Sequence, residues 1–154
     1  MRTKLLSAIV VFFTVICLFP VSLASDISQE IEYQEDGSYF ITVLEDDTPG
    51  ISLLSTTTKT KSKTTTCYNA DGTSRWSIKV TGTFTYGDGS AKCTASSVTA
   101  QSYDSHWTIV SKSASRSGNK AIATATANNI KIGTVQKTVS KSVTLTCSAT
   151  GVFS

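Results

Sequence analysis

The chain has 154 residues, a formal net charge of +3, 40% hydrophobic residues, four cysteines and one histidine. This length corresponds to one domain after removal of a leader, with enough chain to bury a modest core. A single histidine with dispersed cysteines excludes the usual zinc sites, which need several such ligands at close spacing.

The first 24 residues have the pattern of a secretion signal. Arg2 and Lys4 precede an apolar stretch over residues 5–19, and small residues at the −3 and −1 positions favour cleavage between Ala24 and Ser25. An uncleaved anchor is the alternative, because the stretch is about as long as the roughly 20 apolar residues that span a bilayer. We expect a secreted, extracellular or envelope-associated protein with no membrane span in the mature chain.

Charge divides the rest of the chain into two segments. Residues 25–58 hold eight acidic residues and no lysine or arginine, whereas residues 59–154 hold twelve basic and three acidic residues. The predicted organisation is a signal peptide over 1–24, an acidic arm or pro-segment over 25–58, and a basic β domain over 59–154. The acidic segment, with strand composition over 38–44, is an arm that adds a strand or stays mobile, a pro-segment that masks the basic domain, or an interaction tail.

The basic segment has the two-residue period of β-strands. Its first stretch, TTTKTKSKTTT over 56–66, predicts a linker or an edge strand guarded by lysines. Strands are expected near 63–69, 75–86, 91–101, 106–115, 120–131 and 134–148, separated by turn signals that contain glycine or asparagine. The fold class is therefore all-β, an antiparallel sandwich of about six to seven strands.

The strand at 75–86 carries the clearest alternation. Trp76, Ile78, Val80 and Phe84 share one face, and polar residues share the other. Gly82 on the apolar face indicates a bulge or close packing. Four alanines alternate along 120–131, which indicates a close approach of the opposing sheet.

Three cysteines remain after cleavage, and their spacing resembles that of immunoglobulin domains. Cys93 and Cys147 are 54 residues apart with Trp107 between them, although Leu145 stands where those domains place their conserved tyrosine. We therefore predict an immunoglobulin-like sandwich with a Cys93–Cys147 disulfide, and Cys67 as a free or intermolecular thiol.

Few residues suggest catalysis or metal binding. Asp104 and His106 could share one face of a strand, and with a serine they could form a triad. A surface histidine beside a turn acid is the simpler interpretation. We predict no catalytic residues, no metal and no cofactor.

The basic residues suggest a binding function. Lys59, Lys61, Lys63 and Lys79 are the candidate contacts for a polyanion. We expect a monomeric, non-enzymatic binding module for anionic envelope polymers or glycans, with no specific nucleic-acid recognition. The alternative is a secreted antimicrobial or toxin-like effector made with an acidic pro-segment.

Two motifs also resemble a known family. W-S-x-x-V-T-G-T-F-T-Y over 76–86 and L-T-C-S-A-x-G over 145–151 are similar to a family of small secreted proteins of Gram-positive bacteria, a domain of unknown function. The resemblance covers residues 66–154, and it implies secretion and a compact β domain without assigned catalytic residues.

Overall fold

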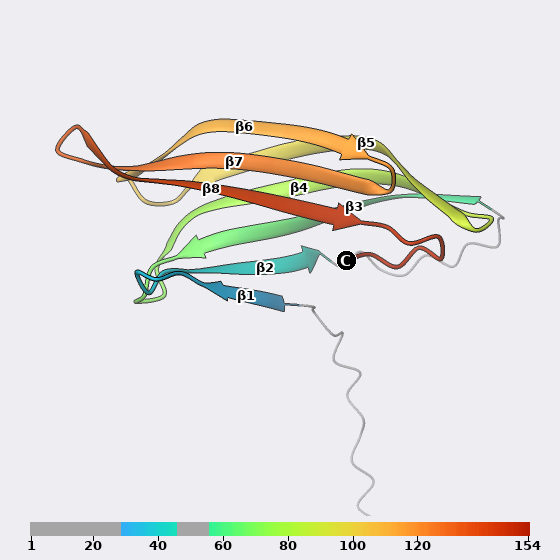
Figure 1. The fold of residues 1–154 in the computed structure, drawn as a ribbon, viewed down its shortest axis with the longest axis horizontal. Helices are drawn as coiled ribbons and strands as arrows, with labels where there is room; N and C mark the ends of the chain where they lie inside the picture. The colour runs from blue at the N-terminus through green and yellow to red at the C-terminus, as the bar shows by residue number, and fades with distance from the viewer. Residues whose placement is uncertain (1–28, 46–55) are drawn as a thin grey trace, which may run out of the picture.

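The computed structural model describes residues 29–45 and 56–154. Its elements are eight strands (Figure 1): β1 (Gln29–Tyr33), β2 (Tyr39–Glu45), β3 (Thr56–Tyr68), β4 (Ser74–Gly87), β5 (Ser90–Ser102), β6 (Trp107–Ser117), β7 (Lys120–Lys131) and β8 (Thr134–Thr146). The predicted signal peptide and its cleavage site at Ala24 and Ser25 lie outside the described residues.

The strands form two antiparallel sheets. The larger has the order β1-β2-β3-β4-β5 and the smaller the order β6-β7-β8, and the two form separate layers (Figure 1). The all-β antiparallel prediction is confirmed, with eight strands in the described residues instead of six or seven. Each sheet is a meander, in which consecutive strands are neighbours. The immunoglobulin-like prediction is not confirmed, because that fold requires Greek-key connections.

Alternation along β4 builds the centre of the core as predicted. Trp76, Ile78, Val80 and Phe84 are fully buried on its inner face, where each removes apolar surface from water. Gly82 lies among them because a Cβ atom there would stand 2.5 Å from the Phe84 ring. A bulge in the β4–β5 pairing follows, between Thr83 and Phe84.

The smaller sheet covers part of the larger one through small side chains. The four alternating alanines of β7 (Ala121, Ala123, Ala125 and Ala127) are fully buried in the core between the sheets. They bring the sheets close enough that a Cβ atom at Gly82 would lie 2.7 Å from that of Ala121. The predicted close approach is confirmed.

The acidic residues 29–45 form a β1–β2 hairpin on the larger sheet. Phe40 is buried at 3% exposure, and its ring lies 6.0 Å from that of Trp76 in an edge-on arrangement. β3 therefore pairs with β2 on one side and β4 on the other. The linker alternative for residues 56–66 is wrong, because the run belongs to strand β3. The hairpin covers only residues 62–68 of that strand, and, among the described residues, 56–61 pair with β4 alone, as an edge strand does.

Candidate binding site

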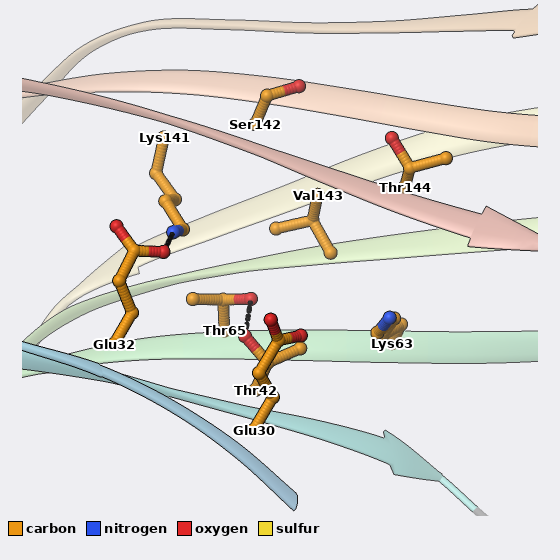
Figure 2. Close-up of a pocket in the computed structure, with 9 residues that line it drawn as sticks. All are labelled: Glu30, Glu32, Thr42, Lys63, Thr65, Lys141, Ser142, Val143 and Thr144. Carbon is orange, nitrogen blue, oxygen red and sulfur yellow. Dashed lines mark hydrogen bonds and ion pairs between the residues drawn. The ribbon is translucent and has the colours of Figure 1, made fainter. Parts of the chain in front are cut away.

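A polar cavity lies where the two sheets cover each other incompletely. The backbone of β8, the last strand of the smaller sheet, approaches β3 and β4 closely, whereas in the described part of the chain it reaches β1 and β2 only through the Lys141 side chain. The cavity between β8 and β1–β3 has a volume of about 310 Å³. Figure 2 shows the residues that line it: Glu30, Glu32, Thr42, Lys63, Thr65, Lys141, Ser142, Val143 and Thr144.

Strand register explains why charged side chains face inward here. Glu30 pairs with Thr42, and Thr42 with Thr65, so these three residues form one row across the sheet. Side chains directly opposite each other in a sheet share a face. This row shares its face with buried Phe40, because residues two apart along a strand point the same way.

An ion pair closes one end of the cavity by linking the two sheets. Lys141 on β8 reaches across to the carboxylate of Glu32 on β1 (Figure 2), and its Nζ lies 4.6 Å from the centre of the Phe40 ring. The hydrogen bond from Lys141 lowers the pKa of Glu32. Lys141 is therefore held by both a carboxylate and an aromatic face.

A second ion pair lies beyond that end of the cavity. The Lys137 ammonium is 2.5 Å from the carboxylate of Asp36 in the β1–β2 turn. The hydrogen bond from Lys137, followed by those from Ser38, holds the pKa of Asp36 well below its usual range. The acidic hairpin is thus tied to the basic body by two lysines of β8.

The middle of the cavity holds charged groups without protein partners. In the described part of the chain, neither the Glu30 carboxylate nor the Lys63 ammonium makes a hydrogen bond or an ion pair. The hydroxyls of Thr42 and Thr65 bond to each other at 2.8 Å. These groups together offer one acceptor, one cationic donor and several hydroxyls to a ligand.

The structure separates the four lysines predicted to contact a polyanion. Lys59, Lys61 and Lys63 alternate on the inner face of β3, and only Lys63 lines the cavity. Lys61 is 4% exposed and donates to the Glu45 carbonyl oxygen at 3.3 Å. Lys79 lies on the opposite face of the sheet, 2.7 Å from the Glu45 carboxylate, and its hydrogen bond lowers the pKa of that carboxyl. The four do not form one patch.

The three cysteines are free, buried thiols, so the structure contains no Cys93–Cys147 disulfide. Both predicted partners nevertheless contact the β6–β7 turn: the Cys93 N–H donates to Gly118 O at 2.8 Å and the Cys147 N–H to Asn119 O at 3.1 Å. Burial raises the pKa of both thiols.

Cys67 lies at the far end of the larger sheet. It pairs with Trp76 on β4, whereas Cys93 pairs with Phe84. Eight residues of strand separate these positions by roughly 27 Å, while bridged cysteines have Cα atoms within about 7 Å of each other. Cys67 is therefore too distant to pair with Cys93 within the chain.

The remaining candidates for chemistry lie away from the cavity. His106 Nδ1 is 3.0 Å from the Asp104 carboxylate, with 60% of the His106 side chain exposed. The hydrogen bond from the His106 backbone lowers the pKa of Asp104. Among the described residues, no group of three His, Cys, Asp or Glu residues could hold a metal ion, and no helix is long and apolar enough to cross a membrane.

Sequence reasoning missed most of the cavity. Glu30 and Glu32 alternate with Ile31 and Tyr33, the period that indicates a strand, but the segment is short and acidic. Lys141 interrupts an apolar alternation on β8, and this interruption and the predicted contact Lys63 are the local signals of the site. Comparisons with protein-family models, curated proteins and solved structures found no match.

Proposed function

We propose that this protein is a secreted, non-enzymatic binding module that holds an anionic envelope polymer or glycan in the cavity between its sheets. The observation that carries the proposal is the unpartnered Lys63 ammonium among hydroxyls on the inner face of a sandwich. An inner sheet face is ordinarily apolar, whereas Lys63 is half-buried on this one and keeps its ammonium accessible from solvent to a ligand. A concave site with a few placed polar groups is the usual form of a ligand site.

The charge of the domain supports an anionic ligand. The described residues include twelve basic and eight acidic side chains. This excess gives the surface a potential that attracts polyanions and weakens as salt is added. Lys63 would form the direct contact inside the cavity, and the hydroxyls of Thr42 and Thr65 would supply hydrogen bonds beside it.

The test is calorimetric titration of the chain from Ser25 to Ser154 with poly(glycerol phosphate) at low salt. Lys63→Gln should weaken binding about tenfold, because a charge-assisted hydrogen bond contributes at least 1.4 kcal/mol. Lys131→Gln removes the same charge from an exposed residue outside the cavity, and it is the matched control. Absence of binding, or equal losses in both variants, would reject the proposal.

The alternative function, an effector with a removable acidic pro-segment, makes a different prediction about the hairpin. Removal of residues 25–58 would take Phe40 out of the core and break the ion pairs of Glu32 and Asp36. These contacts favour an acidic segment that is kept. The intact mass of the protein recovered from its host's medium decides: a start at Ser25 supports the binding module, and a start near Lys59 supports the effector.

A further inference from the structure

We infer that the cavity recognises a zwitterionic group, with an ammonium close to a phosphate or carboxylate, in preference to negative charge alone. This inference rests on the proposed function and narrows its ligand class. The net charge of the cavity lining differs from the positive net charge of the whole domain.

The lining is electrically balanced. It contains two carboxylates, Glu30 and Glu32, and two ammonium groups, Lys63 and Lys141. Glu32 and Lys141 satisfy each other across the sheets, and Phe40 fixes the lysine further. One carboxylate and one ammonium, those of Glu30 and Lys63, are therefore left for a ligand.

These two groups are placed to bind one small ligand together. Glu30 lies in the row of Thr42 and Thr65, and Lys63 lies two residues from Thr65 along β3. Strand spacings of about 4.8 Å and rises of about 3.4 Å per residue separate their Cα atoms by roughly 12 Å on the same face. Two long side chains can close most of that distance, which leaves room for a ligand of a few heavy atoms.

A ligand with one charge would meet a like charge in this cavity. A phosphate drawn to Lys63 is repelled by Glu30, and a simple amine drawn to Glu30 is repelled by Lys63. A zwitterion satisfies both groups, while the side chains of Thr42 and Thr65 lie beside them on the inner face of the larger sheet (Figure 2). Complementary charges of both signs give selectivity against singly charged partners.

The experiment compares three small probes by NMR titration of the chain from Ser25 to Ser154: phosphoethanolamine, inorganic phosphate and ethanolamine. Phosphoethanolamine should bind at least tenfold more tightly than either of the others. Glu30→Gln should abolish this preference without weakening the binding of inorganic phosphate. Lys63→Gln should weaken the binding of both phosphate-containing probes.

Two exposed residues outside the cavity provide charge-matched controls. Glu35→Gln and Lys131→Gln should leave the order of the three probes unchanged. Equal binding of phosphate and phosphoethanolamine, or a Glu30→Gln variant that keeps the preference, would overturn the inference.

The polymer titration separates this inference from the proposed function. If poly(glycerol phosphate) binds through Lys63 but phosphoethanolamine has no advantage over phosphate, the zwitterion inference fails and the binding module stands. If phosphoethanolamine binds selectively and the polymer does not bind, the inference stands and the polymer ligand is rejected. If neither binds, both are rejected.

Discussion

Gly82→Ala tests the sheet packing on which the cavity depends. A Cβ atom at this position would stand 2.5 Å from a Phe84 ring carbon and 2.7 Å from the Cβ atom of Ala121. Both distances are shorter than an ordinary carbon contact, and overpacking of a core costs about 1–3 kcal/mol. Without those contacts, replacing glycine with alanine stabilises a protein by up to about 1 kcal/mol. The sign of the change therefore reports directly on how closely the sheets approach.

Urea unfolding of the chain from Ser25 to Ser154 measures the effect. We expect Gly82→Ala to lower the free energy of unfolding by about 1–3 kcal/mol, with an unfolding temperature lower by several degrees. Ala121→Gly removes one of the two contacts, so the double variant should lose less stability than the two single changes added together. A Gly82→Ala variant as stable as the wild type would refute the packing described here.

Three further predictions follow from other contacts. If oxidation joins Cys93 to Cys147, the closed loop would stabilise the protein by about 4 kcal/mol. In the oxidised protein, Cys147→Ala should then lower the unfolding temperature far more than Cys67→Ala. Equal effects of the two changes, or three alkylatable thiols in the denatured oxidised protein, would reject the pairing. Phe40→Ala should lower the free energy of unfolding in urea by about 3–5 kcal/mol, because Phe40 is buried. Tyr33→Ala should have little effect, because that side chain is 74% exposed. A similar loss in both variants would contradict the packing of the β1–β2 hairpin into the core. The pKa values of Glu32, Asp36 and Glu45 are lowered in the folded chain. The stability that these ionised carboxylates contribute is therefore present above the pKa values of the unfolded chain and is lost as the pH falls below about 4. The free energy of unfolding measured from pH 7 to pH 2 should show a smaller loss in Asp36→Asn, and an identical pH dependence in that variant would count against the ion pair.

The strands of the basic segment could be predicted because their signals are local. Along β4 the apolar and polar residues alternate without interruption around Gly82, and the turns at both ends contain glycine. One such turn places Asp88 and Gly89 at φ values of 49° and 75°, the left-handed conformation that tight hairpins require. Local pattern and observed structure agree wherever one face of a strand is apolar.

The cavity could not be predicted, because it depends on contacts between distant segments. Glu30 and Lys63 share a face only because β2 pairs with both β1 and β3. Lys141 contacts Glu32, more than a hundred residues away in the chain. The lysines of β3 indicated a solvated surface by composition, whereas alternation with buried Thr65 places Lys61 and Lys63 on the face toward the smaller sheet. Charge composition therefore suggested the kind of ligand but not its location.

The most direct test of the binding site is to map the contact surface of poly(glycerol phosphate) on the isotopically labelled chain from Ser25 to Ser154 by NMR. We expect the largest shift changes at Lys63, Thr65 and Thr42, around the cavity. Changes concentrated at exposed lysines outside the cavity, such as Lys112 and Lys131, with the cavity residues unaffected, would contradict the proposed site.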